Sequence, residues 1–344
     1  MSLHVVTGAG GFIGGHLVAA LTREGHEVRA VDVKPFERWY QRVPGVDEIR
    51  LDLTGLTACR QAVDGASVVF NLAADMGGIG YIEDHKARCM LNVLINTHLL
   101  LASRHEGVGR YFFASSACVY AADKQSHPDV RGLAEHDAYP AMPEDGYGWE
   151  KLFSERMCRH FHEDFGLETR VGRYHNVYGP HGAFDDGREK APAALCRKVA
   201  AAKLGGSPVI EIWGDGRQSR SFTFIDDCLT GTQLIAAADV AEPLNLGSSE
   251  LVTIDDLVDV VEEVAGTRLE RRYLQEAPQG VRGRSSDNTR IRQLLDWEPA
   301  SPLVTGIEVT YRWIYDRMRA GRAGVAPVSP GPGLLVAQPA EPLS

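Results

Sequence analysis

The stretch HVVTGAGGFIGGHLVAAL, residues 4–21, decides the fold that we predict for this chain. It begins with a short run of strand-forming residues and continues, after a glycine-rich turn, into a segment predicted to be helical over residues 12–24. Gly8, Gly11 and Gly14 lie where the strand turns into the helix. Because they lack side chains, the backbone can approach a pyrophosphate, to which the helix N-terminus presents its free N–H groups. The stretch therefore predicts a dinucleotide-binding turn.

Strand-like and helix-like segments alternate along the chain after this turn. The predicted strands cover residues 27–31, 67–72, 110–115 and 168–173, and the predicted long helices cover residues 83–105 and 148–165. Such alternation is typical of a parallel sheet with helices on both faces. The expected fold class is α/β: a Rossmann-type doubly wound parallel sheet with a smaller C-terminal α/β lobe for the substrate.

An acidic residue follows the second predicted strand and indicates which dinucleotide binds. Asp32 stands where a carboxylate accepts hydrogen bonds from ribose hydroxyls and repels a 2′-phosphate, which favours NAD over NADP. Asp52, in the sequence LDL, is placed to bind the adenine amino group. We therefore expect NAD as the cofactor.

A tyrosine and a lysine begin the helix predicted to start near residue 148. Tyr147 and Lys151 are four residues apart, which puts both side chains on one face of that helix. A nearby ammonium lowers the pKa of a phenol, so the tyrosinate can take a hydroxyl proton while hydride leaves for a nicotinamide. Combined with the glycine turn, the pair predicts reversible oxidation of an alcohol.

Together these features resemble the extended short-chain dehydrogenase/reductases. The resemblance rests on the glycine turn, NLAA at 71–74, SSACVY at 115–120, the Tyr147/Lys151 spacing and RYHNVYGP at 173–180, and it covers about residues 1–320. It implies a doubly wound nucleotide domain and a small lobe that holds a nucleotide sugar. The cofactor-binding residues that we expect on this basis are Gly8, Gly11, Phe12, Ile13, Gly14, Asp32, Asp52, Leu72, Ala73, Tyr147 and Lys151.

Longer stretches are similar to one group within that family, the GDP-mannose 3,5-epimerases. They are ADMGGIGYI (74–82), SSACVY (115–120), GREKAPAALCRK (187–198), IWGDGRQSRSFTFIDD (212–227) and GVRGRSSDN (280–288). The resemblance implies that NAD oxidises the hexose at carbon 4, with Tyr147 as the base. The ketone then makes the protons on carbons 3 and 5 acidic.

Inversion of a ring carbon requires removal of a proton on one face and its return on the other. By the resemblance, Cys118 and Lys190 are the two acid/base groups, and Ser116 hydrogen-bonds the oxygen on carbon 4. A cysteine suits this work because a nearby cation lowers its pKa, and a lysine because desolvation lowers its own. The expected catalytic residues are thus Tyr147, Lys151, Ser116, Cys118 and Lys190.

The same resemblance implies a set of residues that contact the GDP-sugar. They are Gly78, Ser116, Cys118, Asn176, Glu189, Lys190, Lys198, Gln218, Arg220 and Arg284. Arg220 and Arg284, with Arg282 sharing the task, are expected to clamp the diphosphate, because a guanidinium binds two phosphate oxygens at once. Inversion at carbon 5 alone would give GDP-L-gulose, and inversion at both carbons GDP-L-galactose. The sequence leaves this choice and the nucleotide base open.

Two units and a tail are expected along the chain. Residues 1–175 are expected to form the NAD-binding domain, with residues 221–241 returning to it. Residues 176–220 and 242–320 are expected to form the nucleotide-sugar lobe. Residues 324–344 are dense in proline and glycine, which predicts a disordered tail.

Composition excludes several other classes of protein. A formal charge of -10 argues against nucleic acid as the main partner. The six cysteines are scattered, with no pair at zinc-site spacing, so we expect no metal and reduced thiols in the cytoplasm. No apolar run is long enough to span a membrane, and residues 1–20 lack the basic start of a leader. A homodimer through the two long helices is expected from the family.

Two alternatives stay open at this point. A UDP-sugar 4-epimerase would use Tyr147, Lys151 and NAD but would turn the keto sugar over, so that Cys118 and Lys190 would be unnecessary. A non-catalytic, dinucleotide-sensing regulator would keep the glycine turn and perform no chemistry. The intact Tyr147 and Lys151 argue against the regulator.

Overall fold

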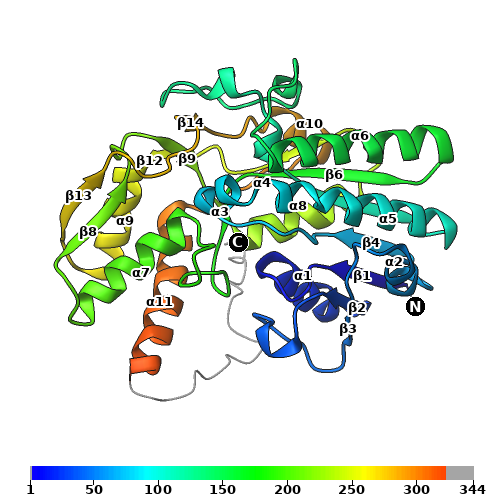
Figure 1. Cartoon of the computed structure of the whole chain (residues 1–344), viewed down its shortest axis with the longest axis horizontal. Helices are drawn as coiled ribbons and strands as arrows, with labels where there is room; N and C mark the ends of the chain where they lie inside the picture. Colours follow the sequence, from blue (N-terminus) through cyan, green and yellow to red (C-terminus); the bar gives the residue numbers. More distant parts are fainter. Residues whose placement is uncertain (1, 323–344) are drawn as a thin grey trace, which may run out of the picture.

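A computed structural model describes residues 2–322, and its largest element is a parallel sheet of seven strands in the order β11-β6-β5-β4-β1-β2-β3 (Figure 1). The strands are β1 (Leu3–Thr7), β2 (Glu27–Asp32), β3 (Asp47–Arg50), β4 (Val68–Asn71), β5 (Arg110–Ser116), β6 (Thr169–Tyr174) and β11 (Leu244–Leu246). The chain proceeds outward from β1 through β2 and β3, and then returns to the other side of β1 with β4. This reversal is the place where doubly wound sheets bind ligands, beyond the carboxyl ends of the strands. The predicted fold class is confirmed.

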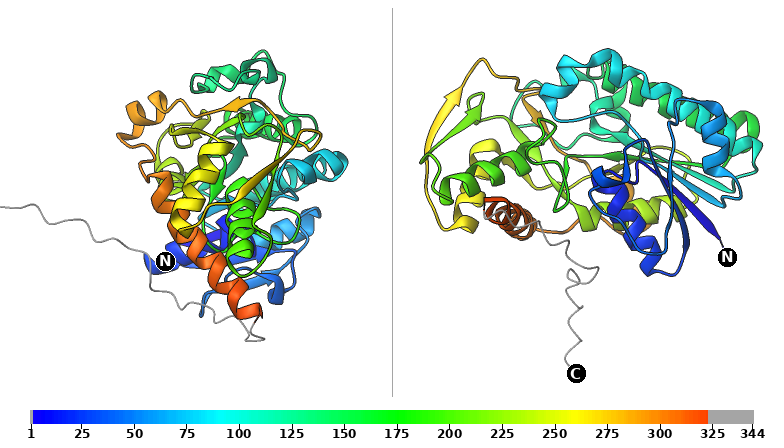
Figure 2. Two further views of the ribbon diagram at one scale, coloured as in Figure 1. Left: turned by 90° about the vertical axis from the view of Figure 1, so that its left-hand side faces the viewer. Right: turned by 60° about the horizontal axis from the view of Figure 1, so that its bottom comes forward.

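Both faces of this sheet are buried, because neighbouring residues along each strand point to opposite sides. Val5 and Phe113 join one apolar cluster with α2 (Leu56–Val63), α5 (Asn92–His105) and α6 (Tyr147–Phe165). Val6 and Phe112 join another cluster on the opposite face, with α1 (Phe12–Arg23) and α8 (Ile225–Ala237). Figure 2 shows these two helical layers on either side of the sheet.

The helix predicted over residues 83–105 is wrong as a single element. The structure has α3 (Ile79–Asp84), α4 (Lys86–Met90) and then α5. His85 interrupts the helix with φ −130° and ψ 39°, and its ring stacks on Tyr81 at 4.3 Å between centroids. The apolar spacing that suggested one helix begins only at α5, so it contained no signal for the interruption.

The remaining strands form small sheets beside the large one. They are β7 (Val177–Tyr178) with β10 (Thr223–Phe224), β8 (Val209–Trp213) with β13 (Glu270–Leu274), and β9 (Ser219–Ser221) with β12 (Leu251–Thr253) and β14 (Gly283–Arg284). The helices of this part are α7 (Ala191–Lys203), α9 (Ile254–Ala265), α10 (Thr289–Leu295) and α11 (Leu303–Arg322). Short 3₁₀ helices complete the elements: η1 (Phe36–Arg38), η2 (Ala117–Val119), η3 (Ala122–Gln125) and η4 (Glu135–Ala138).

The expected division into two units stays a proposal, and two observations bear on where its boundary lies. β11 falls within the range expected for the lobe, yet it pairs in parallel with β6 and extends the large sheet. In addition, Phe112 of the large sheet shares one core cluster with Val199 of α7, Val261 of α9 and Ile314 of α11. The parts are therefore joined by a continuous apolar core. The tail predicted at 324–344 lies outside the described residues.

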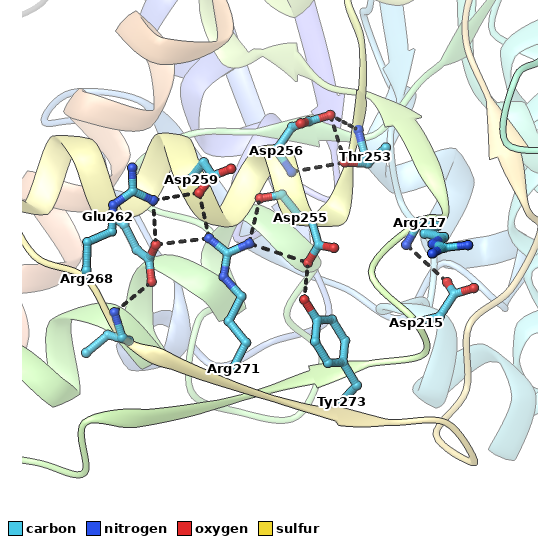
Figure 3. Close-up of polar contacts among 11 residues, drawn as sticks. Asp215, Arg217, Thr253, Asp255, Asp256, Asp259, Glu262, Arg268, Arg271 and Tyr273 are labelled. Carbon is cyan, nitrogen blue, oxygen red and sulfur yellow. Dashed lines mark hydrogen bonds and ion pairs between the residues drawn. The ribbon is translucent and has the colours of Figure 1, made fainter.

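Charged side chains hold β13 against α9 at the outer edge of the smaller part (Figure 3). Arg271 pairs with Asp259 at 2.6 Å and with Glu262 at 3.0 Å, and Arg268 reaches the same two carboxylates at the same distances. Isolated surface ion pairs contribute little, but a shared network whose central carboxylate is buried fixes geometry. β13 in turn pairs with β8, which ends at Trp213. No helix within residues 2–322 is both long and apolar enough to cross a membrane.

Candidate active site

The glycine turn forms a backbone cradle at the carboxyl end of β1. Gly8 has φ +71°, and a Cβ there would lie 2.8 Å from the carbonyl carbon of Leu72 at the end of β4. A Cβ on Gly14 would overlap the carbonyl oxygen of Gly8. The N–H of Gly11 donates to that same oxygen at 3.0 Å, just before α1 begins at Phe12. The cradle leaves the first N–H groups of α1 free to bind a pyrophosphate.

Asp32 lies at the end of β2 and is bound to this turn. Its two carboxylate oxygens accept the backbone N–H groups of Gly10 and Lys34, each at 2.9 Å. A carboxylate oxygen has a second lone pair, so Asp32 fits a ribose diol as well. The turn is lined by Phe12 and Ile13 of α1 and by Leu72 and Ala73, which follow β4.

Asp52 is placed differently from the other expected cofactor residues. Its side chain is exposed, and one carboxylate oxygen accepts from both the N–H and the hydroxyl of Thr54, at 3.0 and 2.7 Å. These hydrogen bonds, the backbone one first, lower the pKa of Asp52. Asp52 thus stabilises the turn that it forms with Thr54. Its contact with adenine stays a prediction.

Sequence reasoning missed one residue beside the glycine turn, Trp39. A Cβ on Gly10 would lie 2.6 Å from the indole ring, and the N–H of Tyr40 donates to the carbonyl of Gly10 at 3.3 Å. The indole N–H donates to Lys34 at 3.1 Å, which fixes the ring in place. A tryptophan in a loop has no spacing signal, so only the folded chain brings it to the turn.

Tyr147 and Lys151 lie on the first turn of α6 and are both buried, at 5% and 3% exposure. The Lys151 ammonium lies 5.5 Å from the centre of the Tyr147 ring and 4.6 Å from that of Phe113. It also lies 3.7 Å from a carboxylate oxygen of Glu150. As predicted, both residues lie on one helix.

The expected lowering of the tyrosine pKa is wrong for the protein by itself. Burial raises the pKa of Tyr147 well above its ordinary value, and the neighbouring Cys118 and Glu150 raise it further. Burial also raises the pKa of Glu150. The phenol is therefore neutral at rest, because loss of hydration disfavours the charged tyrosinate.

Ser116 and Cys118 follow the end of β5, where the strand turns into η2. The Ser116 hydroxyl oxygen accepts the N–H of Cys118 at 3.2 Å, which leaves the hydroxyl proton available to a ligand. Cys118 belongs to one buried cluster with Tyr147, Cys89 and Ile82. The start of α6 lies directly on this turn, because a Cβ on Gly148 would overlap the carbonyl oxygen of Cys118.

Cys118 faces a buried set of charged and polar groups that the sequence did not reveal. Arg284 of β14 approaches its Sγ at 3.7 Å, while Glu144 binds the same guanidinium at 2.9 Å and Gln125 binds its Nε at 2.6 Å. Burial raises the pKa of the Cys118 thiol to about 12, and Glu144 adds to this while Arg284 opposes it. Glu144 lies in a loop and Gln125 ends the short helix η3, and single polar residues in such segments are usually solvated.

Lys190 lies at the N-terminus of α7, on a loop that meets the stretch around Gly78. A Cβ on Gly78 would lie 2.5 Å from the carbonyl oxygen of Glu189, and the N–H of Gly78 donates to Arg188 at 3.0 Å. Loss of hydration lowers the pKa of Lys190, whereas a thiolate at Cys118 would raise it. The structure therefore brings the Lys190 loop into electrostatic range of the thiol.

Three expected substrate residues lie farther out, around α7 and β8. Lys198 donates to the carbonyl of Glu211, and Gln218 donates to that of Trp213 at 2.7 Å. Glu189 accepts from Arg197 at 3.2 Å. Among the described residues, Oε2 of Glu189 and Oε1 of Gln218 are buried acceptors without a hydrogen-bond donor. Buried acceptors of this kind suit a polar ligand.

The expected diphosphate arginines occupy different surroundings. Arg220 donates to the carbonyls of Ser219 and Val281, and burial together with Arg284 lowers the pKa of Arg220 to about 9. The Arg284 guanidinium lies 3.7 Å from the Cys118 Sγ. Arg282 makes two hydrogen bonds with Asp215, at 3.1 and 3.0 Å. The clamp role of these arginines stays a prediction.

Asn176 takes an unusual backbone conformation, with φ +41°. Its side-chain amide donates to the carbonyl of Ser221 at 2.9 Å, and so ties the end of β6 to β9. Asn176 therefore connects the end of a large-sheet strand with β9, the strand that contains Arg220. No group of three or more His, Cys, Asp or Glu residues in the described part of the chain is placed to hold a metal ion.

The fold and site define an NAD-binding enzyme of the short-chain dehydrogenase/reductase type, with the glycine cradle beside an acidic β2 end and a Tyr147/Lys151 pair beyond β5. The chain belongs to the NAD dependent epimerase/dehydratase family, which matches residues 4–247. The expected resemblance is thereby confirmed. NAD is the cofactor of this family, and the cradle and Asp32 fit its pyrophosphate and ribose.

Known proteins similar to this chain include two plant enzymes and one bacterial structure. GDP-mannose 3,5-epimerase 1 of Oryza sativa subsp. japonica is 44% identical over 91% of this chain and 82% of its own length. GDP-mannose 3,5-epimerase of Arabidopsis thaliana is 43% identical over 94% and 85%. UDP-glucuronic acid 4-epimerase from Bacillus cereus, solved with UDP-glucuronic acid and NAD, has a TM-score of 0.76 and 26% identity over 91% of this chain and 98% of that one.

Proposed function

We propose that this chain is a GDP-mannose 3,5-epimerase. The observation that carries the proposal is the second acid/base pair: the Cys118 thiol lies in one buried cluster with Tyr147, and Lys190 lies within electrostatic range of it. An enzyme that only oxidises and reduces carbon 4 has no use for such a pair. Relatives of that name are 43–44% identical to this chain over more than nine-tenths of it.

The first stage is oxidation at carbon 4. Tyr147, once ionised to the tyrosinate, takes the proton of the hydroxyl, and Ser116, whose hydroxyl proton is available, holds the same oxygen. Lys151, buried beside the phenol ring, stabilises the tyrosinate while it exists. Bound NAD supplies the site that accepts the hydride and later returns it, so no separate redox partner is needed.

The second stage is proton transfer at carbon 5, and at carbon 3 where both centres invert. The ketone makes these protons acidic, and Cys118 and Lys190, from separate loops, act on opposite faces of the ring. Re-reduction then gives GDP-L-gulose or GDP-L-galactose. Glu189 and Gln218, each with a buried acceptor free, and Gly78, Asn176, Lys198, Arg220 and Arg284 are the expected contacts to the nucleotide sugar.

Incubation with GDP-mannose in deuterated water tests this function. We expect deuterium at carbon 5, and deuterium at carbon 3 would show that the second centre also inverts. UDP-glucose and UDP-glucuronic acid under the same conditions are the controls. A lack of exchange with GDP-mannose, together with conversion of a UDP-hexose, would refute the proposal.

The second candidate is a UDP-sugar 4-epimerase, which the fold of the Bacillus cereus enzyme supports. Such an enzyme returns hydride to the other face of carbon 4 without breaking a ring C–H bond at carbon 5. The deuterium experiment therefore separates the two candidates. A non-catalytic regulator would bind NAD and show neither exchange nor conversion.

We further propose a homodimer through α5 and α6. These helices pack side by side (Figure 1), and their outer face carries exposed apolar side chains. Leu94 and Leu101 of α5 are 38% and 39% exposed, and Trp149 and Phe153 of α6 are 46% and 51% exposed. We expect light scattering to report a dimer, and Phe153→Glu to shift it toward monomer. A monomeric wild-type protein would contradict this proposal.

A cytoplasmic location is also proposed, on the state of the cysteines. All six are free thiols in the structure, and each is buried. Free thiols persist in reducing compartments. Fractionation of the source cells, with this chain detected by antibody, would test the location, and recovery from an oxidising compartment would contradict it.

A further inference from the structure

Arg188 joins the loop before α7 to the loop after β4. One terminal nitrogen of its guanidinium donates to Asp75 at 2.8 Å and to the carbonyl of Met76 at 3.2 Å. The other donates to the Tyr81 hydroxyl at 2.9 Å, and the guanidinium carbon lies 4.0 Å from the centre of the Tyr81 ring. One side chain therefore binds three residues that are 107 to 113 positions away in the sequence.

The same two loops also meet through their backbones. The N–H of Gly78 donates to the carbonyl of Arg188 at 3.0 Å. A Cβ on Gly78 would lie 2.5 Å from the carbonyl oxygen of Glu189, so the close approach of the two chains requires a glycine at this position. The loop over residues 75–81 is thus shaped to fit the chain directly before Lys190.

Asp75, Tyr81 and Arg188 form a closed triangle of hydrogen bonds. The Tyr81 hydroxyl donates to Asp75 at 2.8 Å and accepts from Arg188 with its oxygen. Burial would raise the pKa of Asp75, but the hydrogen bonds from Tyr81 and Arg188 hold it below its ordinary value. Burial raises the pKa of Tyr81, and Asp75 raises it further. The carboxylate is thus ionised and the phenol neutral, which are the states that the triangle requires.

Asp75 is itself anchored beside the candidate active site. Its backbone N–H donates to the side-chain oxygen of Asn92 at 2.7 Å, and the Asn92 amide donates back to the carbonyl of Asp75 at 3.1 Å. Asn92 is 4% exposed and begins α5. In addition, Tyr81 packs against the buried cluster that contains Cys118 and Tyr147. The loop that the guanidinium binds is therefore fixed to the cluster that holds candidate catalytic residues.

We propose that Arg188 is a positioning residue, which holds the backbone before α7 so that Lys190 reaches the sugar ring for proton transfer. This role rests on the proposed function. Arg188 does not touch the sugar in this scheme, and it acts through the two residues that separate it from Lys190, the N-cap of α7. Oxidation at carbon 4 uses Tyr147 and Lys151 of α6, so it should not depend on Arg188.

Backbone amide exchange tests the junction of the two loops without any substrate. We expect Arg188→Gln, in the full chain, to exchange the amide of Gly78 at least about tenfold faster than wild type, because the loop that carries its acceptor is no longer held. Mass spectrometry of the peptides that cover residues 75–81 and 186–190 measures this exchange. Unchanged amide exchange in both peptides would overturn the proposal, whatever the substrate is.

Turnover of GDP-mannose tests the consequence for catalysis. Arg188→Gln should lose about 10²-fold in deuterium incorporation at carbon 5, because a displacement of about 1 Å is enough for such a loss. Transient reduction of bound NAD, followed by rapid-mixing absorbance, should keep the wild-type rate. An equal loss in both measurements would overturn the proposal, since a general loss of structure affects both stages. Full incorporation at carbon 5 would overturn it as well.

The matched control is Arg88→Gln, which removes a guanidinium from the same carboxylate. Arg88 of α4 is 63% exposed and lies 3.6 Å from Asp75. Both partners of this pair precede β5 in the chain, so the pair does not join the two loops. We expect wild-type amide exchange and wild-type deuterium incorporation. Equal changes in Arg88→Gln and Arg188→Gln would overturn the proposal, because the charge near Asp75 would then be responsible.

Arg188→Lys shows whether the forked shape of the guanidinium is needed. An ammonium keeps the charge but cannot present the planar fork that binds Asp75 and Tyr81 together. Incorporation at carbon 5 should therefore fall by about tenfold, between wild type and Arg188→Gln. This variant also decides the question if Arg188→Gln fails to fold. Wild-type incorporation and wild-type amide exchange in Arg188→Lys would then overturn the proposal.

The two measurements separate this inference from the proposed function. A wild-type protein that incorporates no deuterium from GDP-mannose would refute the function, while amide exchange would still decide whether Arg188 holds the loop. Faster amide exchange in Arg188→Gln with unchanged incorporation at carbon 5 would refute the dependence of Lys190 on Arg188, and the proposed function would stand.

Discussion

The two proposed acid/base pairs of this molecule are built in different ways. Tyr147 and Lys151 lie on one turn of one helix, and a local spacing of four residues places them together. Cys118 follows a strand of the large sheet and Lys190 begins a helix of the smaller part, so only the fold brings them within range. The first pair is thus rigid and local, and the second depends on how two parts of the chain pack.

This difference also governs the electrostatics of the pairs. The Tyr147 phenol and the Cys118 thiol are both buried and neutral at rest. Only the thiol contacts a cation–carboxylate pair, which Arg284 and Glu144 form. In the proposed function, the local pair performs the oxidation and reduction at carbon 4. The surroundings of Cys118 and Lys190 can adjust the pKa values of that pair. Variants of the two pairs should therefore fail at different stages of the reaction.

The largest effect is expected from Tyr147→Phe. Without the phenol, the hydroxyl proton at carbon 4 has no acceptor, so both stages stop, and exchange should fall by about 10³- to 10⁴-fold. Deuterium incorporation and the absorbance of reduced cofactor are the measurements, and both should be lost. Retained exchange in this variant would mean that another group oxidises the sugar.

Cys118→Ser should block only the second stage. NAD should stay bound, and GDP-mannose should still reduce it transiently, whereas exchange should fall by about 10²- to 10³-fold because one of the two proton-transfer groups is missing. Rapid-mixing absorbance and deuterium incorporation measure the two stages separately. Unchanged exchange would remove Cys118 from the mechanism, and loss of cofactor reduction would show that the two pairs are not separable.

Gly14→Ala tests the cradle on which both pairs depend. The added Cβ would overlap the carbonyl oxygen of Gly8, a backbone atom that cannot move away without distorting the turn. We expect a loss of about 1–3 kcal/mol in the free energy of unfolding, and weaker NAD binding. Denaturant unfolding with and without NAD measures both, and Gly25→Ala is the control for adding a methyl at an open position, although its φ of +87° carries its own strain. A normal affinity for NAD would contradict the role of the cradle.

Asp32→Asn should have the smallest effect, confined to the cofactor. One oxygen can still accept a backbone N–H, but the negative charge toward the ribose is lost, so NAD should bind about tenfold more weakly, or ~1.4 kcal/mol. Discrimination against NADP should narrow at the same time. Titration with both dinucleotides measures this, and an unchanged preference would show that Asp32 does not read the ribose.

Much of the fold was predictable because its signals are local. The strand, glycine turn and helix at residues 4–21 and the alternation that follows predicted the doubly wound sheet. The strand β11 was assigned to the smaller lobe, since three residues carry too little pattern to show that they pair with β6. The break at His85 was missed for a similar reason, because a single residue's backbone angles leave no trace in apolar spacing.

The candidate site likewise has a part that local sequence predicts and a part that only the fold decides. The sequence by itself determined the dinucleotide turn and the Tyr147/Lys151 pair, since the backbone conformation of a few neighbouring residues places each of them. Only the tertiary structure decided that Glu144, Gln125 and Arg284 surround Cys118, and that burial keeps both the thiol and the phenol protonated. The physical reason is that pKa values and long-range contacts depend on hydration and neighbours that a linear chain does not contain.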